Sequence, residues 1–191
     1  LIAREIFSPT RRFVMDRDHL VEKVSIGALY SSPLGAVSVA VSERGLRKVV
    51  FGSPADLECE FQNASEGQSP LLQAVLDQLD EYFHSARKIF DLPIDWPAGS
   101  AFKLAVMQAA QKIPYGSVRS YAQLAEEAGH AGAARAVGSV MAHNPMLIVV
   151  PCHRVVASNN RLGGFSAPGG LDTKMFLLGL EGLKIVDQRL G

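Results

Sequence analysis

The sequence Met-Leu-Ile-Val-Val-Pro-Cys-His-Arg at residues 146–154 decides how the second half of this chain is expected to fold. Its first five residues are all apolar, which is typical of a strand that is buried on both faces. Such a strand would deliver Cys152 and His153 at its end. Because successive side chains of an extended strand point to opposite faces, direct contact between these two would require a turn or a bridging water.

Cys152 is a candidate nucleophile, and two further residues could activate it. A free thiol keeps most of its proton below a pH of about 8.5, so it needs a neighbouring base, which His153 could be. A carboxylate that orients the imidazole would complete a Cys, His, acid chain. Of the five carboxylates beyond residue 100, Glu181 is the best placed, because it ends an apolar helical segment over 171–178. Alternatively, Cys152 is a buried structural thiol and His153 a core histidine.

Two short helices are expected upstream of this stretch. Ser120 and Gln123 form a capping box that opens a helix reaching about residue 128. A glycine-rich connection at 129–132 leads to the next helix, over 133–143. Two short helices joined in this way are a candidate helix-turn-helix.

The helix over 133–143 has a surface almost without side chains, apart from Arg135. A helix that reads the major groove needs several long polar side chains. A bare helix with one cation suits close approach to the minor groove, with that cation pushed into the base stack. Alternatively, the small residues indicate only close helix packing. The small residues expected to face DNA are Ala134, Ala136 and Gly138.

Charge is unevenly distributed along the chain, although the net charge is zero. Residues 1–100 hold 10 basic and 14 acidic side chains, whereas residues 101–191 hold 9 and 5. From 128 to 171 there is no carboxylate, while three arginines lie in that range. A surface without carboxylates favours the approach of a phosphate backbone. The C-terminal half is therefore the candidate nucleic-acid binder.

The first half of the chain has a different pattern. Alternating apolar residues and turn signals over 37–51 predict a small antiparallel sheet, and helical spacing over 71–83 predicts a helix on one of its faces. We therefore expect an α/β (α+β) fold. We divide it into an N-terminal extension of unknown role (1–24), a sheet-and-helix domain (25–97) and a mostly helical domain (98–191).

The composition excludes several classes of protein. An apolar run of five residues is far shorter than the roughly 20 that a membrane span needs, and the first residues lack the apolar core of a signal peptide. Two cysteines, Cys59 and Cys152, do not make a disulfide framework, which favours the reducing cytoplasm. We expect no metal site, because the cysteines and five histidines show no ligand spacing.

Residues 151–155, Pro-Cys-His-Arg-Val, with Asn-Pro at 144–145 before them, resemble the active-site signature of the O6-alkylguanine-DNA alkyltransferases, also called methylated-DNA–protein-cysteine methyltransferases. Further matching blocks, all in the family's order, are the helix at Phe102, Tyr115-Gly116, Ser120-Tyr121, 133–138, Gly164-Phe165-Ser166 and 180–182. The N-terminal half resembles the family's ribonuclease-H-like domain more weakly. The resemblance implies a C-terminal domain of winged-helix or helix-turn-helix type.

The resemblance also implies a role for each matching residue near the thiol. Cys152 would accept the alkyl group, and His153 would act on it as a base through a water. Glu181 would hold His153. Asn144 would brace the turn that joins the helix over 133–143 to the active-site strand.

Other matching residues would meet the DNA. Arg135 would enter the duplex where the damaged nucleotide has left, and Tyr121 would press on its 3′ phosphate and bond the extruded base. Ser166 and the backbone carbonyl of Val155 would line the guanine pocket. Leu147, which stands where many relatives carry a proline, would lie beside that pocket.

The activity implied is DNA repair in which each molecule acts once. The alkyl group of O6-alkylguanine, and of O4-alkylthymine, in double-stranded DNA would move irreversibly to Cys152. No cofactor is implied, and we expect a monomer in the cytoplasm that joins the nucleoid when bound to DNA. Two other classes stay open. A non-catalytic alkylated-base binding protein would lack the acceptor cysteine, and a cysteine hydrolase would turn over an ester or amide.

Overall fold

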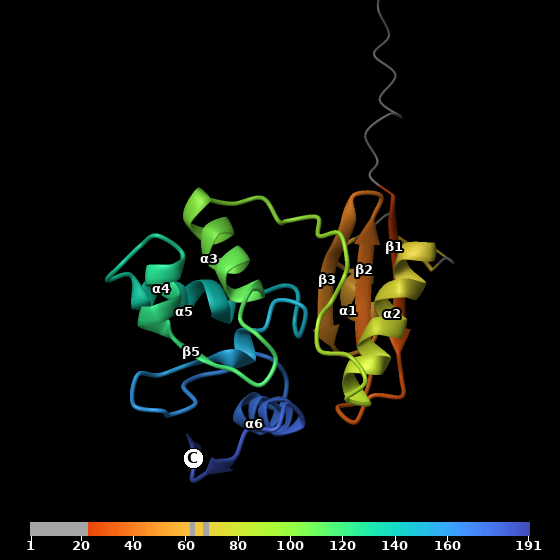
Figure 1. The fold of residues 1–191 in the computed structure, drawn as a ribbon. Coiled ribbons are helices and arrows are strands. Elements are labelled where there is room, and N and C mark those ends of the chain that lie inside the picture. Colours follow the sequence, from red (N-terminus) through yellow and green to blue (C-terminus); the bar gives the residue numbers. More distant parts are fainter. Residues whose placement is uncertain (1–22, 62–63, 67–68) are drawn as a thin grey trace, which may run out of the picture.

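The computed structural model describes residues 23–61, 64–66 and 69–191, so nearly all of the extension expected over 1–24 lies outside the described residues. The described chain has an α/β fold with a sheet part and a helical part (Figure 1). The strands of the sheet part are β1 (Val24–Leu29), β2 (Val37–Ser42), β3 (Gly45–Phe51) and β4 (Ala64–Glu66). None of the helices in this described part is long and apolar enough to cross a membrane.

The sheet has the strand order β3-β2-β1-β4. Its first three strands are antiparallel, as the pattern over 37–51 predicts for β2 and β3. The strand β1 lies outside that pattern, and β4 pairs with β1 in parallel. The central strand β2 is buried along its whole length. It is buried because α2 (Pro70–Phe83) packs on one face of the sheet and the short α1 (Ala55–Glu58) on the other. The helix expected over 71–83 is therefore confirmed.

The helical part contains the other helices that the sequence predicts. Ser120 accepts a hydrogen bond from the amide of Gln123 (3.1 Å), and the Gln123 side chain accepts one from the amide of Ser120 (2.8 Å), which confirms the capping box. The elements here are α3 (Ala101–Gln111), β5 (Arg119–Ser120), α4 (Tyr121–Glu127), α5 (Ala134–Ala142), η2 (Cys152–Arg154), β6 (Val155–Val156), α6 (Gly170–Leu180), β7 (Ile185–Val186) and β8 (Arg189–Leu190).

The strand expected over 146–150 is wrong. This segment is buried throughout, but it folds as tight turns, in which the amide of Val150 donates to the carbonyl of Met146 (2.9 Å). Ile148 lies in the left-handed region with a φ of 72°, where β-branched residues are rare. An uninterrupted apolar run records burial and does not separate a buried strand from another buried path of the chain.

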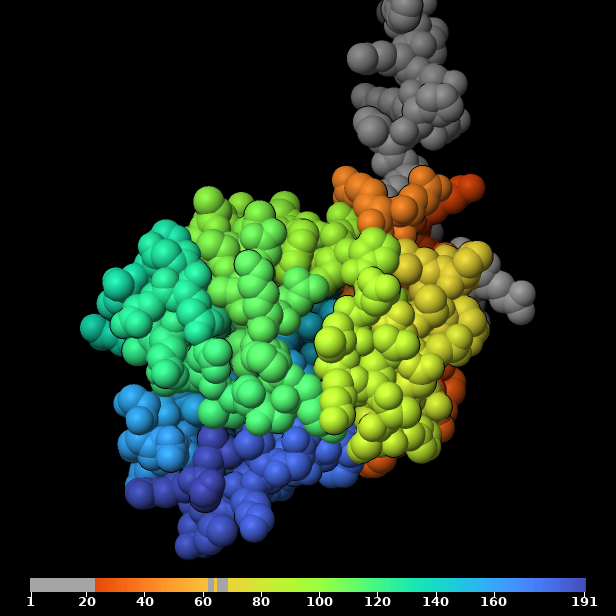
Figure 2. Space-filling view, viewed as in Figure 1, coloured from red at the N-terminus to blue at the C-terminus, as the bar shows by residue number. Residues whose placement is uncertain are grey.

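The edge of β3 joins the two parts of the molecule. The amide of Val49 donates to the carbonyl of Pro145 (2.9 Å), and the carbonyl of Val49 accepts from the amide of Leu147 (3.1 Å). The amide of Leu46 donates to the carbonyl of Pro93 in the segment that links the two parts (2.8 Å). One apolar core runs through both parts, and Figure 2 shows them packed directly against each other.

Asn144 holds the turn over 146–150 in place. Its side-chain amide donates to the carbonyl of Val150 (2.7 Å), and its side-chain oxygen accepts from the amide of Met146 (3.0 Å). Because Asn144 is itself buried, water cannot easily replace it as the hydrogen-bond partner of these backbone groups. The backbone that leads into Cys152 therefore depends on one side chain.

Asn144→Ala should lower the free energy of unfolding by about 2–3 kcal/mol, because buried backbone groups lose their partners. Equilibrium unfolding in urea measures this loss. His143→Ala is the matched control, because His143 is the exposed neighbour. A loss below about 0.5 kcal/mol for Asn144→Ala, the range of ordinary surface substitutions, would contradict the bracing role.

Candidate active site

Cys152 begins a short 3-10 helix, η2, directly after Pro151. The strand that was expected to deliver Cys152 and His153 at its end is therefore not formed, and the chain turns at this point. The Cys152 thiol is almost fully buried, at 5% exposure, and its Sγ lies 3.2 Å from the donating side-chain amide of Asn144. Asn144 thus braces the turn and also contacts the sulfur.

A pocket of about 270 Å³ leads to the thiol. Its walls come from α4, α5 and the loop before α6, and its lining residues are Tyr121, Gly138, Met141, Ala142, Cys152, Gly164, Phe165 and Ser166. The hydroxyl of Ser166 donates to the carbonyl of Ala142 (2.6 Å), which ties the loop to the end of α5. The sulfur can therefore be reached from between the expected helix-turn-helix and this loop.

His153 is fully buried and lies against a carboxylate. Its Nε2 is 2.8 Å from Oε1 of Glu181, the first residue after α6. The other ring nitrogen, Nδ1, is buried without a hydrogen-bond partner among the described residues. An ionised carboxylate can only accept, so Nε2 carries the proton and Nδ1 is left as a free base.

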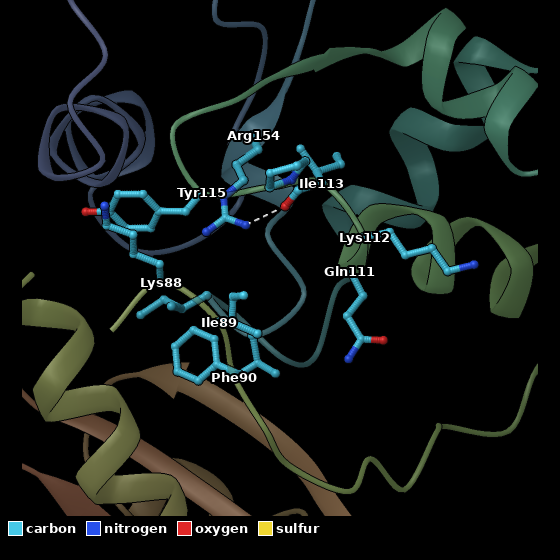
Figure 3. Close-up of a pocket in the computed structure, with 11 residues that line it drawn as sticks. Lys88, Ile89, Phe90, Gln111, Lys112, Ile113, Tyr115 and Arg154 are labelled. Atoms are coloured by element: carbon cyan, nitrogen blue, oxygen red, sulfur yellow. Dashed lines mark hydrogen bonds between the residues drawn. The ribbon is translucent and has the colours of Figure 1, made fainter. Parts of the chain in front are cut away.

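Arg154 forms a bidentate ion pair with the carboxylate of Glu181. Its Nε donates to Oε2 of Glu181 (2.9 Å) and its Nη2 to Oε1 (2.8 Å), while Nη1 donates to the carbonyl of Ile113 (2.6 Å). Figure 3 shows this guanidinium beside the ring of Tyr115, at the wall of a second pocket of about 560 Å³. Cys152 does not line that second pocket.

Two further donors complete the surroundings of Glu181. The amide of Gly116, in the turn after α3, donates to Oε2 (3.1 Å). The phenol of Tyr82, at the end of α2, donates to Oε1 (2.9 Å). The carboxylate therefore receives donors from both parts of the molecule.

These contacts set the ionisation of His153 and Glu181, the hydrogen-bonded pair that we call the relay. Burial by itself raises the pKa of Glu181, but the hydrogen bonds and charges of His153 and Arg154 outweigh it and lower that pKa from 4.5 to about 2. Burial lowers the pKa of His153 below 6.5, against the pull of Glu181. At neutral pH the site thus holds an ionised carboxylate and a neutral imidazole.

The thiol of Cys152 is protonated in the resting protein. Burial raises the pKa of Cys152 above 9.0, although the hydrogen bond from Asn144 and the charge of Lys174 act in the opposite direction. A base must therefore remove the proton during reaction, and the neutral imidazole of His153 is the nearest residue along the chain that can do so.

Lys174, inside α6, is a buried cation that supports the segments around the thiol. Its Nζ donates to the carbonyls of Val155 (2.6 Å) and Leu162 (2.5 Å). Burial lowers its pKa from 10.5 to about 8, while the attraction of Cys152 raises it. Lys174 thus joins β6, directly after η2, to the loop that runs from β6 to α6.

Two residues expected at the guanine pocket, Leu147 and Val155, make other contacts in the structure. Within the described chain, neither Leu147 nor Val155 lines the pocket that reaches the thiol. Leu147 lies in the apolar core with its amide bonded to β3, and the carbonyl of Val155 accepts the bond from Lys174. The side chain of Leu147 therefore contributes to the packing of the core.

The residues expected to face DNA lie on α5. Arg135 and Ala136 are exposed and Ala134 is half-buried, whereas the opposite side of the helix buries Val137 and Met141. A Cβ added to Gly138 would lie 3.8 Å from the Tyr121 ring, so the two helices are close at the mouth of the pocket. The helix α5 thus carries Arg135 and also forms part of the pocket wall.

Sequence reasoning missed Arg154, Lys174 and Tyr82 as parts of the site. Arg154 stands among apolar residues of the signature, and Lys174 interrupts an apolar helix. In both cases the sequence context could have indicated a buried cation. Tyr82 follows the apolar helical spacing of 71–83, and nothing in the sequence relates it to Glu181, 99 residues away.

Comparisons with known proteins agree with this site. The ribonuclease-like domain of 6-O-methylguanine DNA methyltransferase matches residues 26–96, and the DNA-binding domain of the same family matches residues 101–183. The methylated-DNA–protein-cysteine methyltransferase of Methanosarcina acetivorans is 37% identical over 155 residues, which are 81% of this chain and 97% of that protein. The constitutive enzyme of Bacillus subtilis is 38% identical over 152 residues, covering 78% and 91%.

Solved structures give the same result. Mycobacterium tuberculosis O6-methylguanine methyltransferase superposes with a TM-score of 0.70 at 34% identity, covering 83% of this chain and 92% of that one. Mycobacterium tuberculosis OGT in complex with DNA superposes with a TM-score of 0.70 at 33% identity and the same coverage. The chain therefore belongs to the methylated-DNA–protein-cysteine methyltransferase family.

Proposed function

We propose that this chain repairs DNA by moving the alkyl group of O6-alkylguanine, or of O4-alkylthymine, onto Sγ of its own Cys152. The observation that carries the proposal is a buried thiol at the end of a pocket, directly followed in the chain by an imidazole that an ionised carboxylate orients. Such a set of groups gives the thiol a neighbouring general base. The family of the chain supports the same activity.

The reaction is a displacement at carbon. His153 takes the proton of the Cys152 thiol through a bridging water, and the sulfur attacks the alkyl carbon in line with its bond to O6. The S–C bond forms as the C–O6 bond breaks, and the electron pair of that bond stays with guanine. Guanine then takes up one proton, which balances the proton that His153 removed from the thiol, so no proton or electron is gained or lost overall. The thioether has no easy route back, and each molecule therefore acts once.

The damaged base must leave the duplex to react. Cys152 is too deeply buried for a base in a stacked helix to reach it, so the nucleotide has to enter the pocket between α4, α5 and the loop before α6. Arg135 would fill the gap left in the stack, while Ala134, Ala136 and Gly138 let α5 approach the minor groove. Tyr121 and Ser166, which line the pocket, would contact the extruded base.

The same proposal includes the state and place of action of the protein. We infer that one copy acts on double-stranded DNA, because one chain contains the acceptor, the relay and the helix that carries Arg135. An acceptor thiol must also stay reduced, which fits the cytoplasm.

Mixing the protein with a duplex that contains O6-methylguanine should add the mass of one methyl group to the peptide that contains Cys152. Peptide mass spectrometry measures this gain. Cys152→Ser should show none, and Cys59→Ser should react like the parent. An unmodified Cys152 peptide would refute the proposal, and repeated product release without modification would favour a hydrolase.

The rate of reaction with free O6-benzylguanine should be nearly constant between the pKa of His153, below 6.5, and that of Cys152, above 9.0. Below this range His153 becomes protonated and the rate should fall. Above it the thiolate forms without a base and the rate should rise. A rate that instead grows about tenfold per pH unit from pH 6 to 9 would mean that the thiolate reacts without help from His153.

Arg135→Ala should slow the repair of duplex DNA by about tenfold or more, the loss of roughly 1.4 kcal/mol or more, and leave the reaction with free O6-benzylguanine unchanged. Free base needs no help to leave a stack. Single-turnover rates on both substrates measure the difference, with Arg119→Ala as a control from the same part of the chain. Equal losses on both substrates would contradict the proposed role of Arg135.

A further inference from the structure

Tyr82 connects the sheet part of the molecule to the reaction centre. It lies in the last turn of α2, it is completely buried, and its hydroxyl donates to Oε1 of Glu181 at 2.9 Å. In the described part of the chain, it is the one side chain before residue 98 that hydrogen-bonds this carboxylate. The atom that accepts this bond is the same Oε1 that holds Nε2 of His153.

Aromatic packing fixes the position of this hydroxyl. The Tyr82 ring lies edge-on to Phe83 (5.6 Å between centroids) and to Tyr115 (6.2 Å), and it is tilted against Phe90 (5.7 Å). A ring enclosed on several sides loses little further freedom when it makes a hydrogen bond. The hydroxyl is therefore preorganised toward Glu181.

The hydroxyl can act only as a donor to this carboxylate. Burial, and then the charge and hydrogen bond of Glu181, raise the pKa of Tyr82 well above 10, so the phenol keeps its proton. A donor on Oε1 draws negative charge away from the bond to His153. Tyr82 thus fixes the direction of the carboxylate and also limits its basicity.

We propose that Tyr82 is a positioning residue for the alkyl-transfer relay: its phenol holds Oε1 of Glu181, and through it the imidazole of His153, so the reaction centre is complete only when the two parts of the chain are packed together. This inference rests on the proposed function of Cys152. It assigns to the sheet part a direct contribution to the relay, in addition to its role in the common core.

Every charged or titratable neighbour of the relay bears on the expected pH dependence. Glu181 faces Arg154 and His153 from η2 and Tyr82 from α2, and His153 also feels the charges of Arg154 and Lys174. Removing the Tyr82 hydroxyl leaves the cations in place and returns negative charge to the bond with His153. The pKa of His153 should therefore rise.

The proposal is tested by measuring the rate constant with which fluorescent O6-benzylguanine labels the full-length Tyr82→Phe variant at a series of pH values. The plateau rate constant should fall roughly threefold to tenfold, the worth of one hydrogen bond, and the acid limb should move toward higher pH by roughly half a unit to one unit. Because each molecule reacts once, the endpoint gives the active fraction, and the rate constant does not depend on it. The proton resonance of Nε2–H, at neutral pH, should move downfield as the bond to Glu181 strengthens.

Tyr115→Phe is the matched control. This substitution also removes one partly buried hydroxyl and keeps the ring. The Tyr115 hydroxyl donates to the backbone carbonyl of Leu180 (2.8 Å) and not to the carboxylate of Glu181. This variant should keep the acid limb and the Nε2–H resonance of the parent. Its loss of thermal stability gives the scale of a purely structural effect.

The outcomes separate the inference from the function on which it rests. If the parent is labelled once at Cys152 while Tyr82→Phe matches it in rate, acid limb and resonance, the positioning role is wrong and the repair function stands. If Tyr82→Phe loses only active fraction or stability, as Tyr115→Phe does, Tyr82 is structural and the inference is also wrong. If the parent is not labelled, the proposed function fails and the inference with it.

Discussion

One buried negative charge, the carboxylate of Glu181, holds this structure together. An unpaired carboxylate away from water costs several kcal/mol, so a folded chain must surround it with donors. Here the donors come from the end of α2, the turn after α3 and the 3-10 helix that begins at Cys152. Segments far apart in the sequence are therefore fixed around one group. The same charge keeps the proton of His153 on Nε2, so folding and chemistry use one interaction.

The thiol of Cys152 is shielded from bulk solvent. Burial holds Cys152 protonated and His153 neutral, and the pocket limits which molecules reach the sulfur. Asn144 and Lys174 both act on this arrangement, one through the turn that precedes Cys152 and the other through the carbonyl of Val155. An ionised thiol on the surface would react with many electrophiles, whereas this one is protonated and is reached through a pocket.

The sequence predicted the elements whose signals are local and missed those set by distant contacts. The capping box of Ser120 and the helix over 71–83 follow from spacing, and the structure has both. The run over 146–150 reads as a strand because it is apolar, but bonds from Asn144 and β3 fold it into turns and carry Leu147 into the core. The pairing of His153 with Glu181 was expected from the logic of a Cys, His, acid chain and from the resemblance to a family, because few carboxylates follow residue 100. The contact of Tyr82 with Glu181 joins the two parts of the chain, and no local pattern records it.

Activation of the sulfur by His153 depends most directly on which nitrogen of this imidazole carries the proton. Nitrogen NMR of the protein labelled with ¹⁵N-histidine, compared with a His153→Gln variant for assignment, measures this in the resting protein at pH 7. We expect a protonated Nε2 bonded to Glu181 and an unprotonated Nδ1 that is free to accept a proton. A protonated Nδ1, or an imidazolium with both nitrogens protonated, would contradict the account, because His153 would then have no free nitrogen with which to activate the sulfur.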